Sequence, residues 1–346
     1  MTALAPDTLL AIQHAEQQRF IASHPQSMAL ARAAQQHYLF GVPLHWMRDW
    51  PSPATLFVAQ AQGTALTCAD GLRYADFCLG DTGAMFGHSP APLARALAEQ
   101  ASNGLTCMLP ATNAAAVGEA LSNTFGLPMW QMALSASDAN RFVLRWTRAI
   151  TGRPQLLVFD GCYHGAVDDT LVDMDPASGN TLPRPSVLGQ VHNHAAFTRV
   201  VPFNDLPALE AALKQGDVAC LLAEPALTNF GLVPPAPGFW ERARELCRQH
   251  GALFVCDETH TISTALGGYA RAHGLEPDFM VVGKAVAGGL PCAVYGFTHA
   301  VAERMVSTKN AAPEGHSGIG TTLAGNALTL AALQASLEHL HTAANY

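Results

Sequence analysis

Lys284 is the residue whose type and surroundings most clearly predict chemistry. It lies between an apolar, β-branched run and a glycine pair, in PDFMVVGKAVAGGLP, and the only other lysines are Lys214 and Lys309. An amine that folding removes from water loses its proton more easily and becomes a nucleophile, which can form a Schiff base with a carbonyl compound. The alternative is a lysine that stretches from the end of a strand into water.

Four further apolar runs are followed by polar side chains. These are Ser135 and Ser137 after WQMAL, Tyr163 and His164 after LLVFDG, Glu224 after ACLLA, and Asp257 after ALFVC. If each run is a strand of one parallel sheet, these residues all follow carboxyl ends of strands, where ligands bind in open α/β sheets. The sequence therefore predicts one crevice that holds them together with Lys284.

Pyridoxal 5′-phosphate (PLP) is the cofactor that matches this set of side chains. Lys284 would hold its aldehyde, and Asp257 would compensate the protonated pyridine nitrogen that makes the ring an electron sink. Ser135-Ala136-Ser137, between a strand and a helix, offers hydroxyls and backbone N–H groups to the phosphate, and Tyr163 can stack on the ring. The structural alternatives are a helix N-cap or an ion pair for Asp257, a serine N-cap, and a tyrosine at the rim of the site.

The elements that must position these residues alternate along the chain. Residues 1–40 predict one or two amphipathic helices, and TLFVAQAQGTALTCADGLRYADF predicts short antiparallel strands with a turn at Asp70-Gly71. Strands are then predicted at WQMALS, QLLVFDG, ACLLAEPAL, ALFVCDET and DFMVVG, with helices at DANRFVLRWTRAI and FWERARELCRQH. This alternation predicts an α/β fold with a mostly parallel, helix-covered sheet.

The composition argues against several other classes of protein. The 346 residues suffice for about two domains, and a net charge of -8 without a basic stripe argues against a nucleic-acid partner. Neither a signal peptide nor an apolar run of membrane-spanning length is found, so no membrane partner is predicted. The eight cysteines form no CxxC pair and predict reduced, buried thiols in a cytoplasmic protein. His192 and His194 lack further ligands, so no metal site is predicted.

The chain resembles the class III aminotransferases, a fold type I family of PLP-dependent enzymes, from about Gly41 to its end. LFVCDETHT and PDFMVVGKAVAGGLP resemble the family's aspartate and lysine segments in order and spacing, and TGRPQLLVFDGCYHG resembles the stretch around its ring-stacking tyrosine. FCLGDTGAMFGHSP, LLAEPALTNFGLVPP and TTLAGNALTLAA resemble its glycine-rich, Glu-Pro and phosphate-threonine segments. The motifs GCYHG and TGR are nearest to the glutamate-1-semialdehyde 2,1-aminomutase branch.

The resemblance implies a role for each matching residue. Lys284 would carry PLP as an aldimine, Asp257 would bind the pyridine nitrogen, and Tyr163 would stack on the ring. Ser135, Ala136 and Ser137 would hold the phosphate. Asn229 would lie near the phenolic oxygen of the cofactor. Thr322 would reach the phosphate of the neighbouring subunit, in a homodimer with shared active sites. Glu224 matches the Glu-Pro glutamate, which is more structural than catalytic.

Two residues depart from the family pattern close to the cofactor. Ala136 stands where the family's phosphate loop has a glycine, whose missing side chain lets the backbone approach closely. His260 stands where the family often has glutamine or methionine after the aspartate. It donates a hydrogen bond to the phenolic oxygen of the cofactor, alters selectivity, or is a tolerated polar substitute.

Arg48, in GVPLHWMRDW, lies in a segment that resembles the family's irregular passage near the substrate entrance. Its guanidinium is predicted to bind a substrate carboxylate in a bidentate fork, with Trp46 and Trp50 as walls of the pocket. The alternative is a surface arginine that pairs with Asp49 or stacks on a tryptophan.

The resemblance also predicts the organisation and the reaction. Residues 1–75 would form the N-terminal segment of a small domain, 76–325 the large PLP-binding domain, and 326–346 the start of a helix that connects to a missing C-terminal segment. The expected function is the transfer of an amino group from an amino acid to a keto acid or aldehyde. An aminomutase, which returns the amine to a neighbouring carbon, is the alternative within the same chemistry. An inactive PLP-binding remnant, suggested by the early end of the chain, is the alternative from another class.

Overall fold

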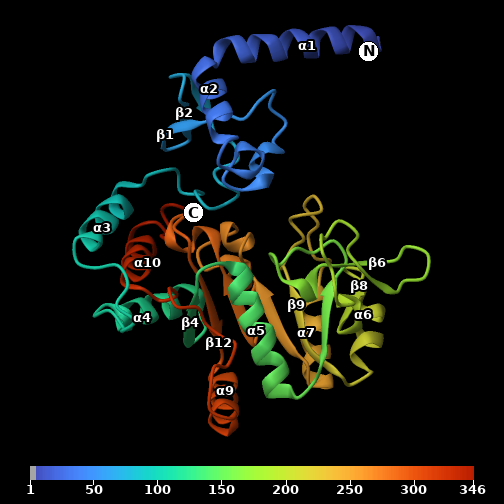
Figure 1. The fold of residues 1–346 in the computed structure, drawn as a ribbon. Coiled ribbons are helices and arrows are strands. Elements are labelled where there is room, and N and C mark those ends of the chain that lie inside the picture. Colours follow the sequence, from blue (N-terminus) through green and yellow to red (C-terminus); the bar gives the residue numbers. More distant parts are fainter. Residues whose placement is uncertain (1–4) are drawn as a thin grey trace. The chain divides into compact units, whose positions relative to one another are not determined.

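The computed structural model describes residues 5–346, which divide into two compact units. The described part of the first unit covers residues 5–79 and 87–90, and the second unit covers 80–86 and 91–346. Figure 1 shows the elements of both units.

The first unit contains two helices and a small antiparallel sheet. Its elements are α1 (Pro6–Ser23), α2 (Pro25–Ala34), η1 (Leu39–Gly41), η2 (His45–Arg48), β1 (Val58–Gln62), β2 (Ala65–Cys68) and β3 (Arg73–Ala75). The predicted antiparallel strands and the turn at Asp70-Gly71 are confirmed, and Gly71 adopts the positive φ of 78° that such a turn requires. The prediction of amphipathic helices fails for α1, because none of its side chains is buried within the described residues.

The second unit is built on a seven-stranded sheet in the order β4-β12-β11-β10-β9-β5-β8. Its strands are β4 (Met129–Ala133), β5 (Gln155–Phe159), β8 (Thr198–Val201), β9 (Val218–Ala223), β10 (Leu253–Asp257), β11 (Phe279–Val282) and β12 (Ala293–Phe297). Only β12 runs antiparallel to its neighbours β11 and β4, so the other six strands share one direction. The predicted mostly parallel sheet is therefore confirmed, although β8 and β12 are strands that the sequence patterns did not single out.

Helices cover this sheet and connect its strands. They are α3 (Ala91–Ala101), α4 (Ala114–Phe125), α5 (Ala136–Thr151), α6 (Leu206–Leu213), α7 (Phe239–His250), α8 (Gly268–Ala272), α9 (His299–Ala311) and α10 (Ala327–His339), with 3₁₀ turns η3 (Asp168–Thr170), η4 (His194–Ala196), η5 (Thr261–Ser263) and η6 (Lys284–Ala287). A hairpin of β6 (Val172–Met174) and β7 (Thr181–Pro183) stands apart from the main sheet. Helix α10 packs on α3 and α4 (Figure 1), and it also contacts η6.

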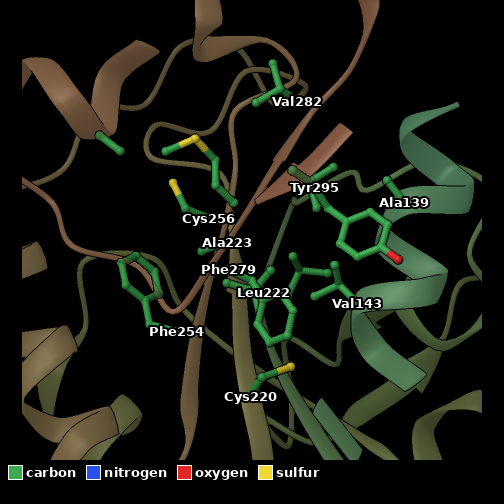
Figure 2. Packing of buried hydrophobic residues seen from close by; sticks show 14 of the residues in the cluster. Ala139, Val143, Cys220, Leu222, Ala223, Phe254, Cys256, Phe279, Val282 and Tyr295 are labelled. Atoms are coloured by element: carbon green, nitrogen blue, oxygen red, sulfur yellow. The ribbon is translucent and has the colours of Figure 1, made fainter. Parts of the chain in front are cut away.

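The central strands are buried on both faces, which explains why the sequence shows them as continuous apolar runs. Every residue of β9, β10 and β11 is buried, and Figure 2 shows Cys220, Leu222, Phe254 and Phe279 packed at the centre of the sheet. On one face these strands meet α5. Burying one such side chain stabilises the fold by about 1.5–3 kcal/mol. The rigid centre fixes the strand ends from which the predicted site residues project.

Six of the eight cysteines are buried free thiols, as the sequence predicts, but Cys78 and Cys107 are exposed. Burial raises the pKa of Cys220 and of Cys292 to about 12, so these thiols stay protonated and unreactive. Among the helices of residues 5–346, none is both long enough and apolar enough to span a membrane.

Candidate active site

One edge of the main sheet collects the polar residues that follow its strands. Strands β4, β5, β9, β10 and β11 run in the same direction, so their carboxyl ends lie at the same edge. Ser135, Tyr163, Glu224, Asp257 and Lys284 follow or end these strands. Ligands bind at this edge in open α/β sheets.

Lys284 opens the 3₁₀ turn η6 and has a positive φ of 48°, which side chains other than glycine rarely adopt. Its Nζ donates a hydrogen bond to Oδ2 of Asp81 at 2.6 Å and also contacts Nε2 of His260. Burial alone would raise the pKa of Asp81, but the hydrogen bond and charge of Lys284 lower it. The Nζ of Lys284 thus lies between a carboxylate and an imidazole.

His260 faces the Lys284 side-chain nitrogen as an acceptor of a hydrogen bond. Its pKa is lowered by burial and by the positive charge of Lys284, so its ring is neutral. Because a neutral imidazole has one N–H, Nε2 can accept from Lys284 only if the proton sits on Nδ1. In the structure, His260 therefore lies close to the lysine amine. The sequence left several roles open for it, including a hydrogen-bond donor to the cofactor and a polar substitute.

Asp257 is a buried carboxylate with three hydrogen bonds. Its Oδ2 accepts from Nδ1 of His164 and from Nδ2 of Asn140, both at 2.8 Å, and its Oδ1 accepts from the backbone N–H of Thr259 at 3.1 Å. Burial would raise the pKa of Asp257, but these donors together lower it. Burial disfavours the charge of His164, yet the neighbouring Cys162 and Asp257 raise its pKa well above the usual range. A charged carboxylate is thereby kept in an apolar setting.

The start of α5 lies beside both the lysine and the aspartate segments. Ser135 is the N-cap of α5, because its Oγ accepts from the backbone N–H of Asp138 at 3.1 Å. Ser137 Oγ accepts from the backbone N–H of Ala166 at 3.0 Å and keeps its own proton for another acceptor. A side chain at Gly165 would overlap this hydroxyl, since a Cβ there would lie 2.1 Å from it.

Ala136 has a structural counterpart that the sequence did not reveal. A Cβ placed on Gly283 would lie only 2.8 Å from the methyl group of Ala136, so Gly283 leaves the space that this methyl occupies. The methyl of Ala136, the residue that departs from the family pattern, is therefore accommodated next to Lys284 at the start of the helix.

The side chain of Glu224 is hydrogen-bonded to the backbone of Tyr163. Glu224 Oε1 accepts from the N–H of Tyr163 at 3.1 Å, and its Oε2 accepts from the hydroxyl of Thr228 at 2.6 Å. Tyr163 and Asn229 both line a cavity of about 550 Å³, and the tyrosine side chain is half exposed. The glutamate fixes the two loops that carry them, which agrees with its predicted structural role.

Thr322 lines a second cavity, of about 530 Å³, together with Met108, Leu109 and Trp130, and neither Lys284 nor Ser137 lines it. Its predicted contact with the phosphate of a neighbouring subunit stays a prediction.

The residues of this edge fit PLP on two structural grounds. An ionised carboxylate offers about four acceptor positions, and Asp257 uses three of them, one of which is on Oδ1. A ring N–H⁺ can therefore be paired there. The first N–H groups of α5 have no partner within the helix and stand at its positive end, which suits a phosphate.

Arg48 belongs to the first unit, and its neighbours there are known. Its guanidinium lies 3.7 Å from the centre of the Phe40 ring, and its Nε is 3.4 Å from Oδ1 of Asp49. Trp46 and Trp50 contact each other edge to face, with ring centres 6.3 Å apart. These contacts are of the kind that the structural alternative predicts, and substrate binding by Arg48 stays a prediction.

If Arg48 binds the substrate carboxylate, Arg48→Lys keeps the positive charge but loses the bidentate fork. The apparent KM for the amino-acid substrate will then rise by about tenfold, the effect of roughly 1.4 kcal/mol, while the PLP content stays unchanged. Steady-state kinetics with absorbance-based PLP counting measures both. An unchanged KM would assign Arg48 to its contacts with Phe40 and Asp49 alone.

Two residues of the site were not identified from the sequence. Asn140 lies inside α5, one turn beyond the serines, and its Nδ2 also donates to the carbonyl of His164. A polar residue on the apolar side of a helix is the signal that would have marked it. Asp81 lies in the glycine-rich stretch GDTG, far from Lys284 in sequence, and nothing in the local pattern indicates that pairing.

Known proteins resemble this chain over most of its length. Residues 47–345 match the family model of the class-III aminotransferases. The chain is 37% identical over 290 residues to glutamate-1-semialdehyde 2,1-aminomutase of Sorangium cellulosum, a match that covers 82% of this chain and 64% of the relative. The corresponding aminomutase of Roseiflexus castenholzii is 36% identical, with 65% of it covered. The chain thus spans slightly less than two thirds of the length of these relatives.

Solved structures agree with the sequence matches. A glutamate-1-semialdehyde-aminomutase from Pseudomonas aeruginosa PAO1 is 48% identical and superposes with a TM-score of 0.94, covering 99% of this chain and 76% of that one. A lysine-to-alanine variant of it was solved in complex with PMP. An omega-transaminase from Sphaerobacter thermophilus is 26% identical, with a TM-score of 0.83 over 94% of this chain and 75% of that one.

These matches confirm the predicted fold type I architecture and the predicted cofactor, PLP. They extend over the segments of Lys284, Asp257 and Tyr163, which form the carboxyl edge of the sheet. This chain belongs to the class-III aminotransferase family of PLP-dependent enzymes.

Proposed function

We propose that this protein transfers an amino group from an amino acid to a keto acid or aldehyde. The observation that carries the proposal is the position of the Lys284 amine. It lies between Asp81 and His260, at the sheet edge that also holds the buried carboxylate of Asp257. An amine, a neighbouring proton acceptor and a buried anion for the ring nitrogen are the groups that PLP-dependent amino transfer uses.

In this proposal PLP supplies an electron sink that stabilises negative charge on the substrate carbon. Asp257 would hold the proton on the ring nitrogen by its negative charge. Lys284 would hold the aldehyde of PLP, and its amine, when free, would take up and return the proton of the substrate carbon as general base and acid. Asp81 Oδ2 and His260 Nε2 both accept hydrogen bonds from Nζ of Lys284, and these contacts hold the side chain in place.

Intramolecular transfer is the second candidate, and the relatives favour it. Two of the relatives named above, at 37% and 48% identity, are called glutamate-1-semialdehyde aminomutases. An aminomutase uses the same lysine and aspartate but returns the amine to a neighbouring carbon of the same molecule. The difference between the two reactions lies in whether the intermediate keto compound leaves the site.

An isotope-transfer experiment separates the two reactions. The PLP-loaded protein is given a panel of ¹⁵N-labelled amino acids with an unlabelled keto acid or aldehyde, and separately ¹⁵N-labelled glutamate-1-semialdehyde alone. For an aminotransferase, mass spectrometry will find the label on the second carbon skeleton. For an aminomutase, the labelled glutamate-1-semialdehyde given alone is converted to the isomer that carries the amine on the neighbouring carbon, without any second carbonyl compound. Lys284→Ala is the control for uncatalysed exchange, and an absence of both reactions with PLP bound would contradict the proposal.

We also propose a homodimer in which Thr322 of each copy completes the phosphate site of the other. The cavity lined by Thr322 is bordered by Met108 and Leu109, which are 77% and 74% exposed, and exposed apolar side chains of this size mark interaction surfaces.

Light scattering will give twice the mass of one chain. Thr322→Ala will weaken PLP binding about tenfold at unchanged mass, the effect of roughly 1.4 kcal/mol for a lost hydrogen bond to a charged group, whereas the neighbouring Thr321→Ala will not. A uniform monomer that binds PLP tightly would contradict the proposal.

A further inference from the structure

We propose that His341, a buried histidine outside the residues assigned above, is a positioning residue that holds Lys284 and His260 in reach of each other. The inference rests on the proposed role of Lys284 as the lysine that binds PLP. His341 follows α10 and is only 3% exposed. Neither the family motifs nor the strand-end pattern of the sequence points to it.

His341 is linked to each of the three segments that meet at the Lys284 amine. Its Nε2 lies 3.2 Å from the carbonyl oxygen of Ala285, the residue after Lys284. Its Nδ1 lies 3.0 Å from the hydroxyl of Tyr346, which is itself 3.0 Å from the carbonyl oxygen of Ile262. Ile262 lies two residues after His260 in η5.

The third segment is the one that carries Asp81. Phe86 lies five residues after Asp81, and its ring meets the ring of His341 edge to face with centres 4.9 Å apart. It also contacts the ring of Tyr346 in the same manner, at 5.6 Å. One buried imidazole therefore touches, directly or through one hydroxyl, all three segments whose side chains form the Lys284–His260–Asp81 cluster.

A proton count fixes how His341 makes these contacts. Burial lowers the pKa of His341 to about 4, so the ring is neutral and has a single N–H. A carbonyl oxygen can only accept, so Nε2 must carry the proton and donate to Ala285. Nδ1 is then an acceptor, and the hydroxyl of Tyr346 donates either to it or to the carbonyl of Ile262. The histidine end of this network has one defined tautomer.

Lys284 needs such support because of its backbone. A φ of 48° at a residue with a side chain is strained and persists only where the surrounding structure enforces it. Ala285, Val286 and Ala287 are fully buried behind it, and the hydrogen bond from His341 adds a directional restraint at the first of them. Loss of this bond would let the 3₁₀ turn relax and move the amine away from the position that it holds beside Asp81 and His260.

Two polar variants separate the two halves of the imidazole. His341→Gln keeps a donor at the distance of Nε2 and so keeps the bond to Ala285. His341→Asn is shorter and keeps only the polar group near Nδ1, toward Tyr346. His339→Asn is the matched control, because His339 lies two residues earlier with a side chain that is 53% exposed.

The measurement is the rate at which PLP, added to protein stripped of the cofactor, forms a borohydride-reducible bond to Lys284. His341→Asn will slow this step by about ten- to hundredfold, the range expected when a reacting group is displaced by a fraction of an ångström to one ångström. His341→Gln will restore most of the rate, and His339→Asn will leave it unchanged. Thermal unfolding of each variant reports whether it is folded.

A double-mutant cycle with Lys284→Ala distinguishes positioning from a general loss of structure. If His341 acts through Lys284, His341→Asn weakens PLP affinity in the wild-type background and has no effect in the Lys284→Ala background. Equal weakening in both backgrounds, or a normal rate in His341→Asn, would overturn the inference. If His341→Asn does not fold, Tyr346→Phe replaces it. It removes the hydroxyl that links Nδ1 of His341 to Ile262 and leaves the bond from Nε2 to Ala285, so a normal rate in this variant would overturn the part of the inference that concerns the His260 segment.

The position of the reduced cofactor distinguishes failure of the inference about His341 from failure of the proposed function. If the reduced cofactor is found on Lys214 or Lys309 in the wild-type protein, the assignment of Lys284 is wrong and the cycle has no basis. If it is found on Lys284 and the His341 variants behave like wild type, only the role of His341 is wrong.

Discussion

Borohydride reduction of the PLP-loaded protein will attach the cofactor to Lys284, and to neither Lys214 nor Lys309. The physical reason is the environment of the amine. Lys284 lies at the carboxyl edge of the sheet with its side chain 25% exposed, whereas the side chain of Lys214 is 61% exposed and pairs with Glu210 on the surface. Peptide mapping by mass spectrometry identifies the modified lysine without ambiguity, because the chain has only three.

Lys284→Ala will lose the reducible bond altogether, and turnover will fall by at least about 10²–10⁴-fold, the contribution of a positioned acid–base group. The variant should still take up PLP without the covalent bond, because the start of α5 and Asp257 remain. Lys309→Ala, on the exposed side of α9, is the control and should retain both the bond and the rate. Retention of the visible PLP absorbance band by Lys284→Ala after borohydride treatment and denaturation would be unexpected, and a reduced adduct on another lysine would refute the assignment.

The sequence predicts the central sheet well because both faces of its strands are buried. Continuous apolar runs such as FMVV in β11 and LFVC in β10 predict strands that are buried on both faces. The polar residue that follows each run marks the edge of the sheet. The edge strand β8, TRVV, alternates less clearly and was not singled out. Helix α1 was predicted as amphipathic, yet Leu9, Leu10, Ile12 and Ile21 are exposed and none of its side chains is buried within the described residues.

Contacts that join distant segments are the part of the site that the sequence could not supply. Asp81 and Lys284 are separated by 203 residues, and Asn140 and Asp257 by 117, so their pairing depends on the whole fold. The same holds for Gly283, whose missing side chain accommodates the methyl of Ala136. Motif resemblance identifies the lysine, the aspartate and the tyrosine, but the groups that adjust their charge and position come from loops and helix turns without a motif.

The second large effect is expected at Asp257, the proposed partner of the ring nitrogen. Asp257→Asn keeps the size and most hydrogen-bonding positions of the side chain but removes its charge. Without that charge the ring nitrogen holds its proton less strongly, and stabilisation of negative charge on the substrate carbon falls. We expect kcat to drop by roughly 10²–10³-fold, or about 2.7–4 kcal/mol, the cost of losing one preorganised electrostatic partner. PLP affinity will change much less, because Lys284 and the start of α5 still bind the cofactor.

Asp278 provides the matched control for this experiment. It precedes β11 at the opposite end of the strands and accepts a hydrogen bond from the backbone N–H of Phe254 at 2.8 Å. Burial raises the pKa of Asp278, whereas the donors around Asp257 lower its pKa, so the two carboxylates are held in different ways. Asp278→Asn should lower the melting temperature with kcat nearly unchanged, while Asp257→Asn should lower kcat far more than PLP content. Asp257 was assigned because no other carboxylate of the described site is both buried and held in its charged form by a histidine. Near-normal turnover in Asp257→Asn would exclude it as the partner of the ring nitrogen.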